Sequence, residues 1–178
     1  LGNPWWRDVL AQGMESRQAR FFDIDWDRDR RVVLPVLGEP LDRLLADKAI
    51  AIAGPTEART LRCGDLRLPL AAGTADDPDA ALPDVLERQH YRLVWWRIAN
   101  DRLNWRRFFD INDLVALRME DEAVFDAVHD KVLALYRDEV IDGLRIDHVD
   151  GLAEPGAYCR RLRARLDALD AVRTRPGG

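Results

Sequence analysis

The stretch of sequence that decides the fold spans residues 142–152 and reads DGLRIDHVDGL. Side chains alternate between the two faces of a strand, so a strand over 143–147 places Leu144 and Ile146 on one face and Arg145 and Asp147 on the other. Strands of a parallel sheet are buried on both faces and are usually apolar throughout. Charged residues on one face indicate a functional site, because parallel barrels build their active sites at the carboxyl ends of strands, where Asp147 lies.

Two other interpretations of this strand stay open on spacing alone. Arg145 and Asp147 are close enough to form a structural ion pair, and such pairs perturb carboxylates without catalysing anything. Asp147, His148 and Asp150 offer oxygen and nitrogen atoms to a metal ion. Consecutive strand residues face opposite ways, however, and neither an EF-hand nor an HExxH spacing is present. The sequence therefore disfavours a metal site, and no metal ligand is assigned.

The elements around 143–147 predict an α/β architecture. A long helix follows the acidic start at 120–122 and carries its apolar face on Val124, Val128, Val132 and Leu135. Pro155 opens a second helix, whose apolar stripe is Tyr158, Leu162, Leu166 and Leu169. Helix, strand and helix in close succession is typical of α/β proteins.

Residues 1–83 predict a small, loop-rich α+β unit. Asn3 can cap a helix that starts at Pro4, and a shorter helix is expected to start at Ser16. Further along we expect a strand at 32–37, a short helix within 39–47, and short strands at 49–53, 60–63 and 66–70. The run 71–83 is rich in Ala, Asp, Gly and Pro and predicts a linker.

Residues 84–178 form the second predicted region, which is richer in helix. The segment 91–96 is apolar and aromatic. Asn112 or Asp113 is expected to cap a short helix that contains Leu114 and Leu117. The predicted domain boundary therefore falls between residues 83 and 84.

Composition excludes several classes of protein. With 47% hydrophobic and 33% charged residues, the 178-residue chain is expected to be globular. A net charge of -5 and dispersed arginines argue against a nucleic-acid partner. No apolar run approaches the roughly 20 residues that span a bilayer, so no membrane partner is expected. Cys63 and Cys159 lie far apart, which favours reduced thiols in a cytoplasmic protein over a disulfide framework.

The stretch 142–152 resembles the fourth-strand motif of the α-amylase superfamily, in which a G-x-R-x-D strand ends in a nucleophilic aspartate. The His-x-Asp-Gly-Leu that follows is similar to the maltooligosyl trehalose synthase branch of that superfamily. Other blocks resemble the same branch in order along the chain: NPWW at 3–6, FFDIDW at 21–26, VLPVLG at 33–38, QHYRL at 89–93, WR at 96–97, NWRRFFDINDL at 104–114 and LR at 117–118. The set covers most of residues 3–162.

The resemblance implies roles for particular residues. Asp147 matches the nucleophile, and Arg145 matches the arginine that orients it and keeps it ionised. Residues expected to bind substrate are His148, Tyr91, Arg107 and Phe108. No cofactor is implied.

The resemblance also implies a reaction. Such an enzyme moves the reducing-end linkage of α-1,4-linked maltooligosaccharides to an α,α-1,1 bond, an intramolecular transglycosylation that is formally an isomerisation and forms trehalose ends. A retaining transfer needs a nucleophile and an acid about 5–5.5 Å apart. The matching glutamate is expected on the next barrel strand, beyond Gly178. The chain opens on Leu1 and is expected to be an internal piece of a longer enzyme, without turnover alone.

Placed on the family's fold, residues 1–83 are expected to be an inserted α+β subdomain. Residues 84–178 are expected to be a helix-rich segment and part of the (β/α)8 TIM barrel, including strand 143–147. Because part of a barrel exposes sheet edges and apolar faces, self-association is expected. The alternatives are a hydrolase of the same superfamily, a non-catalytic glucan-binding domain in which Asp147 only forms an ion pair, and a metal-binding domain.

Overall fold

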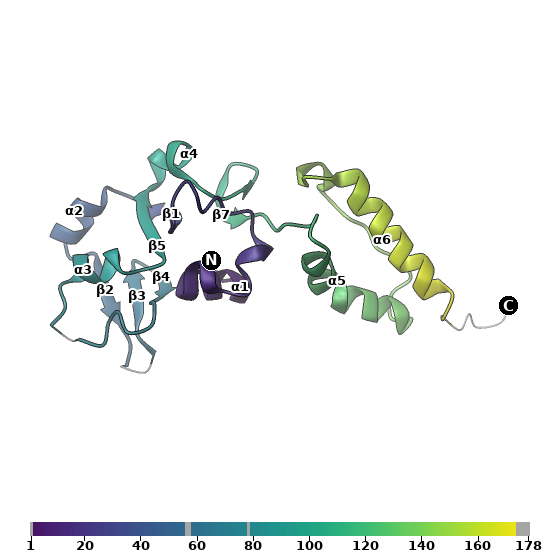
Figure 1. Ribbon diagram of the computed structural model, residues 1–178, viewed down its shortest axis with the longest axis horizontal. Coiled ribbons are helices and arrows are strands. Elements are labelled where there is room, and N and C mark those ends of the chain that lie inside the picture. Colours follow the sequence, from purple (N-terminus) through teal and green to yellow (C-terminus); the bar gives the residue numbers. More distant parts are fainter. Residues whose placement is uncertain (1, 56–57, 78, 174–178) are drawn as a thin grey trace. The chain divides into compact units, whose positions relative to one another are not determined.

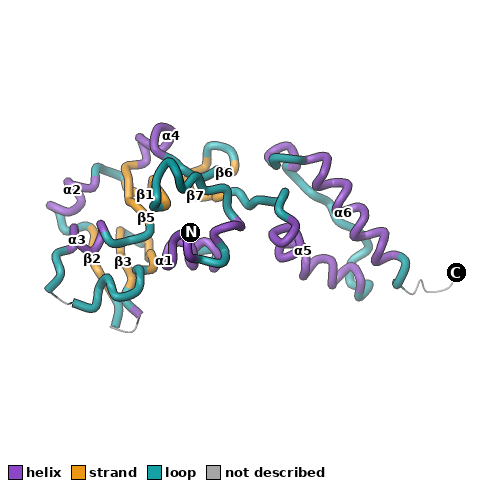
Figure 2. The backbone as a smooth tube through the Cα atoms, in the orientation of Figure 1, coloured by secondary structure: helices purple, strands orange, loops and turns teal. Residues whose placement is uncertain are grey.

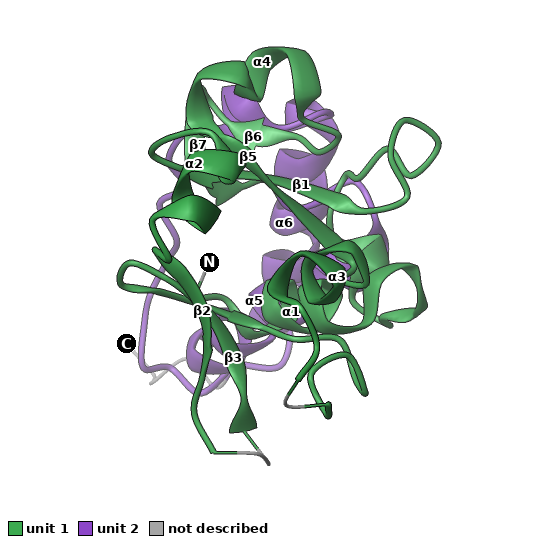
Figure 3. Cartoon of the chain, turned by 90° about the vertical axis from the view of Figure 1, so that its left-hand side faces the viewer, with its two compact units in different colours: residues 1–116 green, residues 117–178 purple. Residues whose placement is uncertain are grey.

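The computed structural model describes residues 2–55, 58–77 and 79–173 (Figure 1). The chain divides into two compact units, unit 1 at 1–116 and unit 2 at 117–178, which Figure 3 distinguishes by colour. Each unit is described by itself below. Both helices and strands are present, so the mixed α/β character predicted from the sequence is confirmed (Figure 2).

Unit 1 opens with α1 (Pro4–Gln12), as the sequence predicts. The side-chain oxygen of Asn3 accepts hydrogen bonds from the backbone N–H groups of Trp5 and Trp6, at 2.9 and 3.2 Å, and so caps the helix. The helix ends at Gly13, whose φ of 63° suits glycine. The short helix expected from Ser16 is instead a pair of 3-10 turns, Gly13–Glu15 and Ala19–Phe21.

A parallel pair of strands forms the centre of unit 1. β1 (Val32–Leu37) pairs with β5 (Tyr91–Trp95), and the register shifts between Leu34 and Leu37, around Pro35. A proline cannot donate to the ladder, so its place at an irregularity is expected. The two strands join residues on both sides of the boundary predicted at 83/84. The observed division into compact units therefore falls later, after Ala116.

The crossover between β1 and β5 carries four short elements predicted from the sequence: α2 (Leu41–Ala46), β2 (Ile50–Ala53), β3 (Thr60–Cys63) and β4 (Leu66–Pro69). It also carries α3 (Leu82–Glu87), a short helix that the sequence analysis did not predict. The strands form an antiparallel sheet in the order β2-β3-β4, and its inner face buries Leu61 and Leu68.

The predicted linker at 71–83 is held against the rest of unit 1. The side chain of Gln89 is buried, and its oxygen accepts from the backbone N–H of Ala71 at 2.8 Å. Its amide group donates to the hydroxyl of Thr74 at 2.9 Å and to the carbonyl of Val85 at 2.7 Å. One buried glutamine thus ties the start of this run to α3 (Leu82–Glu87).

The helix predicted after Asn112 is wrong, because a β-hairpin occupies this stretch. After β5 come a 3-10 turn (Trp96–Ile98) and α4 (Ala99–Arg102), and then β6 (Arg107–Phe108) pairs antiparallel with β7 (Ile111–Val115). Phe109 takes the turn with φ of 54°. Arg107 hydrogen-bonds the side chains of Asp110 and Asn112 across the hairpin, which uses the polar atoms that a helix cap needs.

Unit 2 consists of two helices and their connection. α5 (Glu122–Arg137) and α6 (Pro155–Asp170) confirm the two predicted helices, and a 3-10 turn (Val149–Gly151) lies between them. Their shared core is Phe125, Tyr136, Tyr158, Leu162 and Leu166. The apolar stripe predicted for α6 is therefore confirmed at Tyr158, Leu162 and Leu166. On α5 the buried residues are Val124, Phe125, His129 and Tyr136, a face rotated from the predicted valine stripe.

The strand predicted at 143–147 is not formed. Residues 117–173 are all described and contain no strand, so within unit 2 nothing offers this segment a ladder of hydrogen bonds. The backbone groups of 143–147 make no backbone hydrogen bond among the described residues. A strand exists only by pairing, which explains the difference. No described helix is long and apolar enough to cross a membrane.

Candidate functional site around Asp147

Asp147 lies on the surface of unit 2, just before the 3-10 turn at Val149–Gly151. Its side chain is 76% exposed, and its Oδ2 lies 3.7 Å from Nε2 of His148. His148 has φ of 54° and ψ of 42°, the left-handed region, and its carbonyl accepts from the N–H of Gly151 at 3.2 Å. Such backbone is uncommon for residues other than glycine and is found often at functional sites. The turn therefore leaves the Asp147 carboxylate open to a ligand.

Arg145 makes no ion pair with Asp147 in the described part of the chain, although both residues are described. The structural ion pair considered for these two residues is thus absent here. The contact through which Arg145 is expected to orient Asp147 is also not formed. Both side chains are exposed, so their orienting role stays a prediction.

Apolar residues on either side of Asp147 attach its segment to the core of unit 2. Ile141, Leu144, Val149 and Leu152 are partly buried and pack against the cluster that Phe125 and Tyr158 belong to. Ile146 is among the exposed large hydrophobic residues. The segment is therefore fixed before and after Asp147, while Arg145, Ile146 and Asp147 itself face outward.

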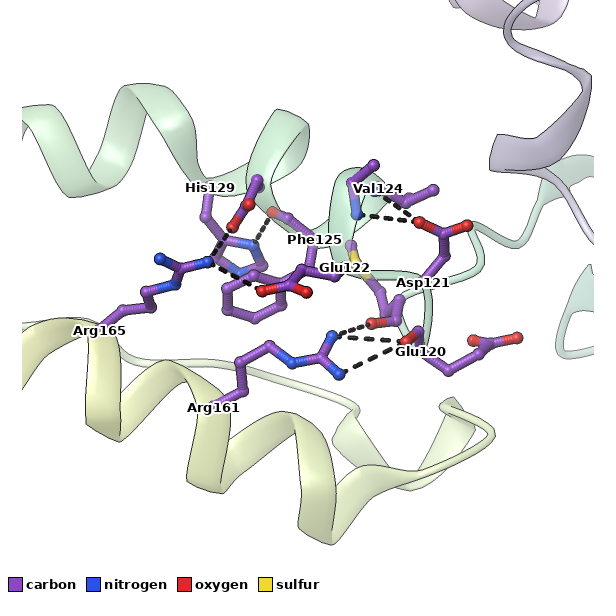
Figure 4. Close-up of polar contacts among 11 residues, drawn as sticks. Glu120, Asp121, Glu122, Val124, Phe125, His129, Arg161 and Arg165 are labelled. Atoms are coloured by element: carbon purple, nitrogen blue, oxygen red, sulfur yellow. Dashed lines mark hydrogen bonds and ion pairs between the residues drawn. The ribbon is translucent and has the colours of Figure 1, made fainter.

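Polar contacts between α5 and α6 hold the two helices that flank this segment (Figure 4). His129 is buried; its Nδ1 lies 2.8 Å from the carbonyl of Phe125 and its Nε2 lies 2.9 Å from the hydroxyl of Tyr158. The Arg161 guanidinium lies 5.3 Å from the Phe125 ring centre. Arg165 contacts Asp126 at 2.8 Å. His129 is thus a core residue with both ring nitrogens in contact with partners.

Arg107 is a structural centre of the β6–β7 hairpin in unit 1. Its guanidinium donates to side-chain oxygens of Asn112 at 2.7 Å, Asn100 at 2.9 Å and Asp110 at 2.9 Å. Phe108 packs edge to face on Phe109, with ring centres 4.5 Å apart. Arg107 therefore has most of its donors engaged with protein groups.

Tyr91 lies in the core of unit 1 rather than at a surface. It is 1% exposed, and its hydroxyl donates to the carbonyl of Pro69 at 2.9 Å. Burial raises the pKa of its hydroxyl far above the usual value, while the charge of Arg7 acts in the opposite direction. This environment gives Tyr91 a structural role and leaves no free surface for a sugar. We do not carry it into the proposed site.

The predicted site residues thus fall into two groups. Asp147, Arg145 and His148 belong to unit 2, while Arg107, Phe108 and the buried Tyr91 belong to unit 1. Sequence reasoning missed Asn112 as a site residue because it read that residue as a helix cap. The stretch INDLV at 111–115 does not alternate between apolar and polar residues, so it carries no clear strand signal. Among the described residues, no group of three or more His, Cys, Asp or Glu could hold a metal ion.

Comparisons with known proteins point to one class, enzymes named as trehalose synthases. No family profile matches the chain. Over 165 residues, 92% of its length, the chain is 45% identical to a putative maltooligosyl trehalose synthase of Mycobacterium tuberculosis H37Rv, of which it covers 20%. It superposes on the structure of maltooligosyltrehalose synthase from Arthrobacter ramosus with a TM-score of 0.82 and 43% identity, covering 93% of this chain and 21% of that one.

A more distant structure gives the same result. A hypothetical maltooligosyl trehalose synthase of Sulfolobus tokodaii is 32% identical, with a TM-score of 0.74, over 91% of this chain and 21% of that one. The resemblance found in the sequence is therefore confirmed: the chain is a relative of the maltooligosyl trehalose synthases. It spans about a fifth of the length of the curated relatives that it matches.

Proposed function

We propose that the chain is part of a maltooligosyl trehalose synthase, a (1→4)-α-D-glucan 1-α-D-glucosylmutase that makes the reducing end of a maltooligosaccharide into a trehalose unit. The observation that carries this proposal is the 45% identity over 92% of the chain. That stretch includes the GLRID sequence with its exposed Asp147. The activity, the substrate and the trehalose-forming role belong to the whole protein, of which this chain supplies one part.

In the proposed reaction, the Asp147 carboxylate attacks the anomeric carbon of the penultimate glucose. The bond from that carbon to O4 of the terminal glucose breaks, and a carboxylic acid gives O4 its proton. The released glucose then turns, and its anomeric hydroxyl attacks the glycosyl–Asp147 carbon while losing a proton to the same acid/base group. Asp147 is regenerated, and the net change is an isomerisation. Excluding water during the turn prevents hydrolysis.

The acid/base glutamate is not assigned to this chain. We propose that it lies in the sequence that follows in the longer protein, so the 178-residue chain has no turnover alone. Arg145 is proposed to approach Asp147 once the segment is paired, since a neighbouring positive charge favours the carboxylate. His148, next to Asp147, is proposed to contact sugar hydroxyls. Arg107 and Phe108 stay proposed substrate-site residues in unit 1.

For the fold, we propose that residues 143–147 form a strand of a (β/α)8 barrel when neighbouring strands are present. The free backbone groups of this segment and its position between two helices support that proposal. Residues 1–83 are proposed to be an inserted α+β subdomain. Neither Cys63 nor Cys159 forms a disulfide, which suits a reducing compartment, and we propose a cytoplasmic location.

The test compares full-length wild type with Asp147→Asn, with maltopentaose as substrate and chromatography of the products. Asp130→Asn, an exposed carboxylate on α5, is the matched control. We expect wild type and control to yield a non-reducing, trehalose-ended sugar and Asp147→Asn to yield none. Shorter maltooligosaccharides and glucose from wild type would identify a hydrolase instead. Sugar binding without any turnover would identify a glucan-binding domain.

A further inference from the structure

A small cavity in unit 1 lies beside the β6–β7 hairpin. Its volume is about 270 Å³, and Trp6, Trp105, Asn3, Asn112 and Asp113 are among its lining residues. The hairpin residues come from β7 and the others from the start of the chain and from the residues before β6. The stretch mistaken for a helix in the sequence therefore builds one wall of a pocket.

The two indoles are fixed in place. Trp6 is 2% exposed and Trp105 is 8% exposed, and their rings meet edge to face with centres 5.4 Å apart. The indole N–H of Trp105 donates to the carbonyl of Val33 at 2.7 Å. The indole N–H of Trp6 has no hydrogen-bond partner among the described residues. This N–H is not among the fully buried side-chain atoms that lack a partner, so it reaches solvent and is available as a donor at the cavity.

The polar groups of the pocket keep hydrogen-bonding capacity that the protein does not use. The side-chain oxygen of Asn112 accepts from Arg107 at 2.7 Å, which leaves its two amide N–H donors free. The oxygen of Asn3 is taken by the α1 cap, so its amide group is also left as a donor. Within the described ranges the Asp113 carboxylate makes neither a hydrogen bond nor an ion pair.

Amide donors and one carboxylate acceptor around an aromatic floor suit a neutral polyol. Each sugar hydroxyl both donates and accepts, and the C–H face of a pyranose is apolar. The carboxylate of Asp113 disfavours an anion. The cavity is smaller than the roughly 300–1,000 Å³ of sites for drug-sized ligands, which limits it to about one sugar ring.

We propose that this pocket binds one glucosyl unit of the glucan substrate, with Asp113 and Asn112 hydrogen-bonding its hydroxyls. The identity of the sugar rests on the proposed function; the presence of the pocket does not. Arg107, predicted to touch substrate, is then a positioning residue that acts by holding Asn112. Because the floor and Asn112 are already fixed, binding needs little reorganisation of unit 1.

The experiment measures maltotriose binding by calorimetry and maltopentaose kinetics in the full-length protein. Asp113→Ala is expected to raise the maltotriose Kd and the KM about tenfold, the loss typical of one hydrogen bond to a charged group, with kcat kept. Asp113→Asn, which keeps an acceptor oxygen, is expected to lose less. Asp65→Asn, an exposed carboxylate in the turn between β3 and β4, is the control and is expected to match wild type.

The outcomes separate this inference from the proposed function. If wild type forms a trehalose-ended product and Asp113→Ala keeps wild-type Kd and KM, the pocket inference is overturned and the function stands. If wild type forms no such product but maltotriose binds and Asp113→Ala weakens it, the function fails and the pocket stands. Thermal melting of each variant at the wild-type temperature confirms that the fold is intact.

Discussion

The side-chain oxygen of Asn104 lies 3.0 Å from the backbone nitrogen of Val33 and accepts its hydrogen bond inside unit 1. The amide group of Asn104 donates to the carbonyls of Asp25 at 3.3 Å, Asp29 at 3.1 Å and Arg31 at 3.1 Å. Asn104 is only 3% exposed. This one side chain therefore joins the start of β1 to the loop before it, and it does so from the residue next to Trp105 in the pocket.

Replacing Asn104 with alanine is expected to lower the free energy of unfolding by about 2–3 kcal/mol, because the buried N–H of Val33 loses its partner. Urea unfolding followed by tryptophan fluorescence measures the change. Asn100→Ala, which removes an exposed partner of Arg107, is the control and is expected to cost about 1 kcal/mol or less. Equal losses in the two variants would show that the buried network of Asn104 is unimportant.

Tyr91 makes the stability of unit 1 sensitive to alkaline pH. Burial raises the pKa of its hydroxyl above the usual value of about 10, so the folded chain keeps this proton while the unfolded chain loses it. The unfolded state then binds fewer protons, and stability falls as pH rises from about 10 towards the folded pKa. Between pH 8 and 11, the free energy of unfolding is expected to fall less steeply with rising pH for Tyr91→Phe than for wild type. Parallel curves would contradict this assignment.

Local patterns predicted much of this fold because they act within a few residues. Asn3 before Pro4 is a cap signal that needs no distant partner, and the helix at 122–137 follows from its apolar spacing. The predictions for the segments 107–115 and 143–147 were wrong, because both structures depend on contacts with residues further away. The hairpin depends on Arg107 reaching Asn112 in the fold, and the strand depends on neighbours that unit 2 does not contain.

The candidate site was predictable to a similar extent. The motif at 142–152 identified Asp147, and the structure shows it exposed beside His148. Burial, however, cannot be read from a motif. Tyr91 lies in a block that resembles the family, yet its side chain is buried and its hydroxyl donates to the carbonyl of Pro69. The sequence marked the pocket residue Asp113 only as a possible helix cap, because an unpaired carboxylate is recognised only when its surroundings are known.

The N-terminus of α5 depends on Asp121. Its carboxylate accepts from the N–H groups of Ala123 at 2.9 Å and Val124 at 3.4 Å. Asp121→Ala is expected to lower stability by about 1 kcal/mol, the usual cost of losing such a cap. Asp121→Asn, also a good cap, is the control and is expected to stay within about 0.5 kcal/mol of wild type. Thermal unfolding distinguishes the two; equal stability of all three proteins would rule out a capping role.

The isolated 178-residue chain is expected to self-associate. Val140, Ile146 and Val172 are exposed in unit 2, and the backbone of 143–147 is free to pair with another chain. Light scattering at several concentrations is expected to show a mass that rises above that of the monomer. Ile146→Lys, which places a charge in the unpaired segment, is expected to reduce the association. A clean monomer at every concentration would contradict the prediction.

The hydrogen bond between His129 and Tyr158 can be tested by a double-mutant cycle. Tyr158→Phe leaves Nε2 of a buried imidazole without a partner and is expected to cost about 1–3 kcal/mol. His129→Leu leaves the Tyr158 hydroxyl unpaired and is expected to cost a similar amount, to which the loss of stacking on Phe125 adds. The double variant leaves neither group orphaned, so it is expected to be less destabilised than the two single losses together. Strict additivity in urea unfolding would show that the 2.9 Å contact contributes nothing to holding α5 and α6, the helices that flank Asp147 in the chain.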